Sequence, residues 1–264
     1  MWTVLLALFA NYVCVSVAQV PIPNRPLGFI YGGAVNAPVV LDCFFDQMCP
    51  DCKAAWPAVK QVAEHYGPNK LQVRFHPFPL PYHHNSYYAN QGAHVVAAYN
   101  ASAVYTWLEA VFEDQDGFGN QRTAGMTPVQ VIARFSELAQ RSTGMPAYEF
   151  VAGINNASVD YATRVSWKYG CSRTVSGTPT FMLNGVQVAA DPSWTESQWQ
   201  QLLDPFFPSQ SPLRASNITC PVGQERCEYL PGKVECCTAG EGCIPNVGCR
   251  CFGKSCGNNT EIVV

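Results

Sequence analysis

Hydrophobic and polar positions in the first part of the chain follow strand-like and helix-like patterns in turn. Residues 28–33 (GFIYGG) and 38–45 (PVVLDCFF) are rich in β-branched and aromatic residues, which predicts two strands. Residues 49–66 then carry apolar side chains at helical spacing, and Gly67-Pro68 directly after them is a typical helix end. The patterns therefore predict two strands followed by a helix.

The pattern changes again after this helix. Residues 71–78 (LQVRFHPF) alternate as a strand with one covered face does, and residues 86–170 are mostly helical. Asn184-Gly185 lies between two apolar runs and predicts a hairpin, since both residues accept positive φ. Residues 195–198 (TESQ) have the spacing of a capping box before a last helix. This order predicts an α/β fold with one sheet and a helical insertion at about residues 84–170.

The cysteines divide the chain into two parts. Residues 19–208 contain four of them and residues 217–257 contain eight, with a linker at 209–216 and a short tail at 258–264. The stretch 204–216 around the linker has three prolines, several serines and no apolar periodicity. We therefore expect one full domain followed by a small cysteine-rich module. The eight cysteines of the module are Cys220, Cys227, Cys236, Cys237, Cys243, Cys249, Cys251 and Cys256.

The first 18 residues form an apolar run that ends in Ser16-Val17-Ala18, which predicts a signal peptide cleaved after Ala18. The run is shorter than the roughly 20 residues that a transmembrane helix needs, and no later run is long enough either, so no membrane association is expected. The final residues EIVV are not an ER-retention signal, so we expect a secreted, extracellular protein. Four glycosylation sequons agree with this route, and they begin at Asn100, Asn156, Asn217 and Asn258.

Charge and cysteine usage exclude several functions. The net charge is −3 and no basic run is present, so nucleic acid is not an expected partner. In an oxidising compartment, cysteines are expected in disulfides rather than as metal ligands. About 40 residues bury too little apolar surface to fold unaided, so the module is expected to contain four disulfides, whose pairing the sequence does not choose. The spacing of its first cysteines resembles small cystine-knot modules, which implies an extracellular protein partner; a stable tail without a partner is the alternative.

Candidate chemistry lies in the segment Cys49-Pro50-Asp51-Cys52, at the start of the predicted helix 49–66. Cysteines at i and i+3 of a helix face the same side, and unpaired N–H groups favour the thiolate of the first. Cys49 would then attack a disulfide and Cys52 would resolve the mixed disulfide.

A structural disulfide or half of a zinc site are the alternatives for these two cysteines. No second C-x-x-C lies nearby, so we expect no metal and no cofactor. The pair His83-His84 is interpreted as surface or insertion-contact residues rather than as metal ligands.

Three segments together resemble the DsbA-like branch of the thioredoxin superfamily over about residues 28–205. They are VVLDCFFDQMCPDC, VRFHPFPLPYHHNSYYANQGA and VSGTPTFMLNG. The resemblance implies a thioredoxin-like sheet with a helical insertion and a dithiol at the edge of a peptide-binding surface. It also implies a cis bond between Thr178 and Pro179, with the backbone of Thr178 hydrogen-bonding an extended substrate.

The residues between the two cysteines, Pro50 and Asp51, are expected to modulate the redox chemistry. Strongly oxidising members of the family have His at the position of Asp51. A carboxylate there disfavours a nearby thiolate, so we expect Cys49 to be less acidic and the disulfide less oxidising than in those members.

Two other cysteines depart from the family pattern. Many members have a buried acid six positions before the first cysteine; Cys43 occupies that position here, and the acid, Asp42, is one place earlier and would point to the opposite face of its strand. Cys171 has no obvious role. Cys43 and Cys171 are therefore candidates for a second disulfide, or for buried thiols.

These observations predict a secreted thiol–disulfide oxidoreductase or isomerase that acts on cysteine-containing proteins through Cys49 and Cys52. The alternative is a redox-silent thioredoxin-fold scaffold whose cysteine-rich tail binds an extracellular partner. A glutathione-using transferase on a related fold is less consistent with the dithiol, because such enzymes generally use a single catalytic residue.

Overall fold

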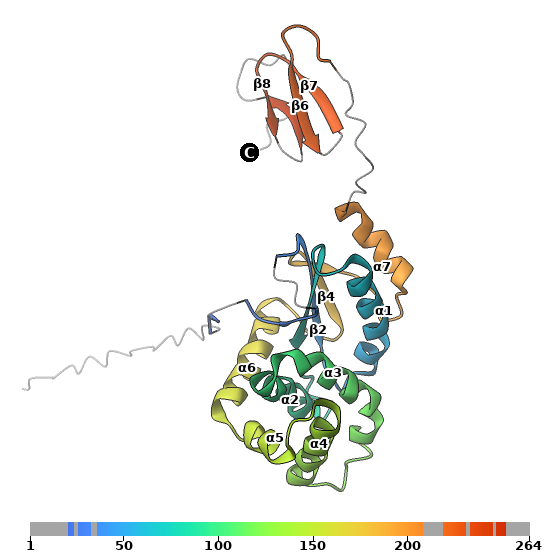
Figure 1. The fold of residues 1–264 in the computed structure, drawn as a ribbon, viewed down its shortest axis with the longest axis vertical. Helices are drawn as coiled ribbons and strands as arrows, with labels where there is room; N and C mark the ends of the chain where they lie inside the picture. The colour runs from blue at the N-terminus through green and yellow to red at the C-terminus, as the bar shows by residue number, and fades with distance from the viewer. Residues whose placement is uncertain are drawn as a thin grey trace, which may run out of the picture. The chain divides into compact units, whose positions relative to one another are not determined.

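A computed structural model describes most of the two predicted parts of the chain (Figure 1). The described residues are 21–23, 26–32, 36–207, 219–230, 233–244 and 247–251. The predicted signal peptide, linker and final tail lie outside them, as do Asn217, Asn258 and Cys256. The chain divides into two compact units, with the boundary between Phe206 and Phe207. No helix among the described residues is long and apolar enough to span a bilayer.

The first unit is built on one mixed sheet with the strand order β1-β3-β2-β4-β5. Strand β2 pairs in parallel with β3 and antiparallel with β4, so it is central. The strands are β1 (Phe29–Ile30), β2 (Val39–Phe45), β3 (Leu71–Pro77), β4 (Thr180–Leu183) and β5 (Val186–Val188). The α/β fold with a single sheet is confirmed. Strand β1 is shorter than the predicted run 28–33, since it pairs only with Phe75 and Arg74 of β3.

Helices cover both faces of this sheet (Figure 1). Successive side chains of a strand point to opposite faces, which separates Phe44 from Phe45 in β2. Phe45 contacts Phe181 of β4, and Phe181 packs edge-on against Trp199 of α7 (Glu196–Leu203), with ring centroids 4.9 Å apart. Helix α1 (Pro50–Tyr66) packs beside α7.

On the opposite face, Phe44 stacks on Tyr169 of α6. The apolar cluster there consists of Phe44, Phe78, Leu80, Val175 and Met182, with Tyr169 packed against it.

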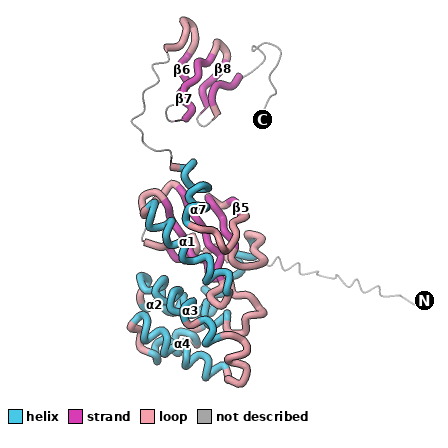
Figure 2. The backbone as a smooth tube through the Cα atoms, turned by 90° about the vertical axis from the view of Figure 1, so that its right-hand side faces the viewer, coloured by secondary structure: helices cyan, strands magenta, loops and turns pink. Residues whose placement is uncertain are grey.

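The helical insertion has its own core, and Figure 2 shows its helices gathered at one end of the first unit. It contains α2 (Ser86–Tyr99), η1 (Ala101–Ala103), α3 (Val104–Glu113), η2 (Gln115–Phe118), α4 (Pro128–Thr143), α5 (Ala147–Ile154) and α6 (Ala157–Ser172). Trp107 is fully buried between Phe135 and Phe150. Gly92 permits this packing, because a Cβ atom there would lie 2.5 Å from the Trp107 ring. The insertion is therefore a helical subdomain with a buried core of its own.

Two predicted local signals are confirmed. Asn184 and Gly185 have φ values of 48° and 81° and form the β4–β5 turn. The Asn184 side chain also accepts a hydrogen bond from the Val40 N–H at 2.8 Å, which joins the turn to β2. Thr195 and Gln198 form the capping box at the start of α7, which is followed by η3 (Asp204–Phe206).

The described part of the second unit contains two small antiparallel hairpins (Figure 2). Disulfides link its strands. Its strands are β6 (Glu225–Leu230), β7 (Lys233–Cys237), β8 (Glu241–Ile244) and β9 (Gly248–Cys251). The described disulfides are Cys220–Cys236, Cys227–Cys243 and Cys237–Cys249, and Cys251 is disulfide-bonded as well. The sulfurs of Cys227, Cys237 and Cys249 lie within 4.8 Å of one another. Since all three are oxidised, they form a disulfide core and not a thiolate metal site.

Candidate active site

Cys49 occupies the N-cap of α1. Its backbone is extended (φ −84°, ψ 123°), and Pro50 begins the helix, where a missing N–H costs nothing. The Cys49 N–H donates to the carbonyl of Asp46 at 3.0 Å, which closes a tight turn between β2 and α1. Gln115 of η2 donates from its side chain to the Gln47 and Cys49 carbonyls, both at 3.0 Å. The helical insertion thereby holds the loop that carries Cys49.

The surroundings of the Cys49 sulfur favour its thiolate. A hydrogen bond with the Cys52 thiol is the main cause that lowers the pKa of Cys49 to about 6, against burial, which raises it. An interaction with Thr178 and the backbone N–H groups of Cys52 and Asp51 lower this pKa further. These N–H groups belong to the first turn of α1 and have no partner within the helix. The local structure therefore favours the thiolate form of Cys49.

Cys52 has the opposite character. It is fully buried, and this burial, followed by the interaction with Cys49, raises its pKa well above the ordinary value. Cys52 therefore remains a protonated thiol while Cys49 is ionised. The roles of attacking cysteine for Cys49 and resolving cysteine for Cys52 stay predictions.

The predicted cis bond between Thr178 and Pro179 is confirmed. The bond directly precedes β4, and the Thr178 carbonyl lies 3.4 Å from the Cys49 sulfur. The sheet therefore brings together two segments that are 129 residues apart in the chain. The binding of substrate backbone at Thr178 stays a prediction.

Asp51 is exposed on α1. Its backbone N–H is one of the groups that lower the pKa of Cys49. The expected effect of its carboxylate on the thiolate stays a prediction.

The buried acid beside the site is Asp46, three positions before Cys49, which the sequence reasoning missed. Its side chain is fully buried and accepts five hydrogen bonds. The donors are the Met48 and Leu80 N–H groups and the side chains of His83, Ser86 and Asn90. Asp46 thus ties the loop before α1 to the connection after β3 and to α2. The aspartate three positions before Cys49 could have been identified as the buried acid from the sequence. The family pattern instead places this acid six positions before the first cysteine, at residue 43.

Asp42 is engaged elsewhere, as its place on the strand suggested. Its carboxylate lies 2.8 Å from His76 Nε2 and 3.9 Å from an Arg74 nitrogen, both on β3. Asp42 is therefore part of a structural cluster on the sheet.

The suggested disulfide between Cys43 and Cys171 is wrong. Both are free thiols: Cys43 is fully buried in β2, whereas Cys171 is exposed near the end of α6. Burial raises the pKa of both thiols, most strongly that of Cys43.

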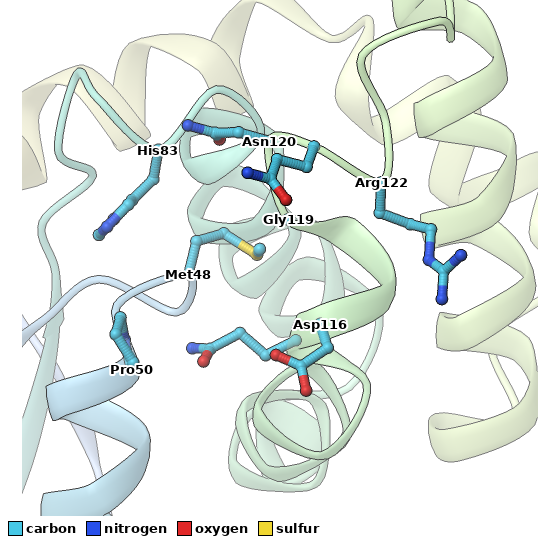
Figure 3. Close-up of a pocket in the computed structure, with 9 residues that line it drawn as sticks. Met48, Pro50, His83, Asp116, Gly119, Asn120 and Arg122 are labelled. Atoms are coloured by element: carbon cyan, nitrogen blue, oxygen red, sulfur yellow. The ribbon is translucent and has the colours of Figure 1, made fainter.

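A cavity of about 650 Å³ opens beside the motif (Figure 3). Met48 and Pro50 line one side of it, and His83, Asn120 and Gln121 line another. His83 is half-buried against Asp46, whereas His84 is exposed, so the pair is divided between an insertion contact and the surface.

Two predicted glycosylation sites lie within the described residues. Asn100 and Asn156 are both exposed, and each caps a helical segment by accepting from a serine N–H two residues later. Their modification stays a prediction.

The fold, the dithiol at the start of α1 and the adjacent cis proline define a thioredoxin-like protein. A family model described as thioredoxin matches residues 28–205, which is more than half of the chain, so the chain belongs to the thioredoxin family. None of the curated protein sequences compared with the chain matches it.

Solved structures of disulfide oxidoreductases, including DsbA-like ones, share this fold. A candidate protein-disulfide isomerase from Pseudomonas syringae is 19% identical, with a TM-score of 0.59 over 67% of this chain and 97% of that one. The thiol-disulfide exchange protein alpha-DsbA2 from Wolbachia pipientis is 17% identical, with a TM-score of 0.53 over 67% and 86%. BdbD from Bacillus subtilis, in its oxidised form, is 14% identical, with a TM-score of 0.54 over 68% and 92%. At these identities the likeness establishes the fold.

Proposed function

We propose that the protein is a thiol–disulfide oxidoreductase that exchanges disulfides with cysteine-containing protein substrates. The observation that carries this proposal is the opposed acidity of the two thiols of one C-P-D-C motif. The pKa of Cys49 is lowered to about 6, whereas that of Cys52 is raised. The low pKa of Cys49 makes a thiolate nucleophile available near neutral pH. The high pKa of Cys52 keeps that thiol protonated until the mixed disulfide has formed.

In the reducing direction, the Cys49 thiolate attacks one sulfur of a substrate disulfide. The substrate S–S bond breaks, a mixed disulfide with Cys49 forms, and the other substrate sulfur leaves as a thiolate that takes up a proton. Cys52 then loses its proton and attacks the Cys49 sulfur. This step releases the second substrate thiol and leaves a Cys49–Cys52 disulfide, so two electrons pass to the substrate. The reverse sequence oxidises a substrate dithiol.

The substrate backbone is placed at Thr178 and Pro179 in this proposal. The Thr178 carbonyl lies beside the Cys49 sulfur, which supports a chain that runs across both. Pro50 and Pro179 present no N–H groups of their own at this surface, so Thr178 is the residue we expect to pair with an extended substrate.

We also infer that the protein works in the secretory pathway or outside the cell. The disulfides of the second unit support an oxidising environment, and so do the exposed sequons at Asn100 and Asn156. If eukaryotic cells secrete the protein and treatment with a glycosidase lowers its mass, this inference is supported. Retention in the cytosol would contradict it.

Trapping of mixed disulfides tests the function directly. A Cys52→Ser variant cannot resolve its mixed disulfides, so client proteins are expected to stay bound to Cys49 through a bond that reductant breaks. The trap should also carry Cys171→Ser, because this exposed free thiol would otherwise capture proteins unspecifically. In parallel, the rate at which the full chain reduces the disulfides of insulin measures thiol–disulfide exchange.

The matched control is a Cys49→Ser/Cys52→Ser/Cys171→Ser variant. It is expected to keep the fold and to trap nothing. If the trap recovers no client beyond this control, and wild type reduces insulin no faster than Cys49→Ser, the redox-silent scaffold is the correct description.

A further inference from the structure

The connection between β3 and α2 places an imidazole next to the motif. His83 Nδ1 lies 2.6 Å from Asp46 Oδ2, and the Asp46 carboxylate is fully buried. Asp46 is also the residue whose carbonyl accepts from the Cys49 N–H. One short segment therefore fixes both the nucleophile and the imidazole.

The same connection is clamped from the other side. The side chain of Asn120, after η2, donates to the Tyr82 carbonyl at 2.7 Å and accepts from the His84 N–H at 2.9 Å. In Figure 3 the His83 imidazole reaches toward the loop that leads from β2 into α1 at Pro50. His83 is thus held by two independent anchors at the edge of the site.

The electrostatics agree with this placement. The hydrogen bond with Asp46 raises the pKa of His83 against burial, which lowers it, and the charge of Cys49 is a smaller cause that raises it further. Among the described residues, no group hydrogen-bonds its Nε2. The other titratable or charged groups around His83 and the motif come from its own loop, from α1, and from η2 and the turn that follows: Tyr82, Asp51, Cys52, Asp116 and Arg122.

We propose that His83, oriented by Asp46, supplies from outside the motif the positive charge that stabilises the Cys49 thiolate. Strongly oxidising relatives have a histidine within the motif, where this chain has Asp51. Here the cation comes from the connection between β3 and α2. This inference deepens the proposed function, since it names the residue that tunes the same thiol.

The proposal has a defined consequence for the redox equilibrium. The thiolate exists only in the reduced protein, because Cys49 carries no charge in a disulfide. A cation that stabilises the thiolate therefore favours the reduced form and makes the disulfide more oxidising. Asp46 acts through His83 and is a positioning residue.

The test is the pH dependence of Cys49 alkylation in the reduced full chain, followed by mass spectrometry from about pH 4 to about pH 9. His83→Gln is expected to raise the midpoint by about half a unit, so that alkylation below the midpoint slows about threefold. The equilibrium constant with glutathione should move about threefold toward the oxidised protein. His83→Lys should restore much of the wild-type rate, because it returns a cation without an imidazole.

His84→Gln is the matched control, because it removes the neighbouring exposed imidazole. Alkylation of Cys171 in the same samples provides an exposed reference thiol, and labelling of buried Cys43 would reveal unfolding. An unchanged midpoint in His83→Gln, or an equal change in His84→Gln, would overturn the proposal.

A reciprocal measurement keeps the test decisive if His83→Gln does not fold. Because coupling between two sites is mutual, Cys49→Ala should lower the pKa of His83 as measured by NMR. An unchanged His83 pKa there would contradict the proposal. Alkylation needs no client, so a shifted midpoint without client exchange would refute only the proposed function, and exchange without a shift would refute only this inference.

Discussion

The two units of this protein use cysteine in opposite ways. In the first unit, Cys43, Cys49, Cys52 and Cys171 are all free thiols. In the second unit, the cysteines that the structure describes are all in disulfides. The same side chain is therefore a free thiol in one unit and part of a disulfide in the other.

The size of the apolar core explains this difference. The first unit buries a large set of aromatic and aliphatic side chains around β2 and within the insertion, so it needs no covalent link. In the described part of the second unit, the buried apolar side chains are those of Cys227 and Cys237. The disulfides there replace a hydrophobic core, whereas a stable core in the first unit leaves Cys49 free for chemistry.

Removing the nucleophile should have the largest effect, and on activity alone. Cys49→Ser is expected to slow disulfide exchange about a thousandfold or more, equivalent to roughly 4 kcal/mol of activation free energy. Its thermal unfolding should stay close to that of wild type, because no link is lost. Insulin reduction and calorimetry on the same preparation check both halves, and a large drop in melting temperature would show that Cys49 is structural.

Breaking a disulfide of the second unit should lower the stability of that unit and leave the exchange activity of the first unit unchanged. The double variant Cys227→Ser/Cys243→Ser is expected to cost this unit about 3 kcal/mol and to leave exchange by the first unit unchanged. Hydrogen exchange by mass spectrometry resolves the two units separately. Equal protection of β6–β9 in the variant and in wild type would show that the hairpins are stable without this disulfide.

Acid should weaken the first unit through His94 of α2. Burial lowers the pKa of His94 to about 4, and its Nε2 has no hydrogen-bond partner within the described ranges. The unfolded chain binds a proton between pH 6.5 and pH 4 and the folded chain does not, so stability falls as the pH drops through this window. At about pH 5 the loss is about 2 kcal/mol.

The variant that checks this is His94→Phe, since the imidazole already packs against Phe29 with ring centroids 5.1 Å apart. Urea unfolding at about pH 7 and about pH 5 should show a smaller difference in the variant than in wild type. An identical difference would assign the acid sensitivity to other groups.

The two free thiols outside the motif should have the smallest effects. Cys43→Ala is expected to cost about 1 kcal/mol, because it leaves a small void in β2. Cys171→Ala should change stability by less than about 0.5 kcal/mol, because the side chain is exposed. Urea unfolding of both variants checks this, and a large loss for Cys171→Ala would point to a contact that the first unit does not show.

Much of the fold could be predicted from the sequence because its signals are local. The strand and helix periods, the Asn184-Gly185 turn and the cap at Thr195 each depend on a few adjacent residues. The spacing of Cys49 and Cys52 placed them correctly at a helix start.

The rest of the site depends on contacts between distant segments. Asp46 and His83 are 37 residues apart, and Gln115 reaches Cys49 across 66 residues. An aspartate, a histidine and a glutamine are common in loops, so no local pattern marks them. The Cys43–Cys171 pairing failed for the same reason, since an even number of cysteines says nothing about distance.

The most direct test of the account is the alkylation of each thiol of the reduced wild-type chain as a function of pH. We predict that Cys49 alone is labelled readily at neutral pH, with a midpoint of about 6, while Cys171 reacts only in more alkaline solution. Cys43 and Cys52 should stay unlabelled until the protein unfolds. A Cys49 midpoint near the ordinary thiol value of 9.0, or equal labelling of Cys52, would contradict the account.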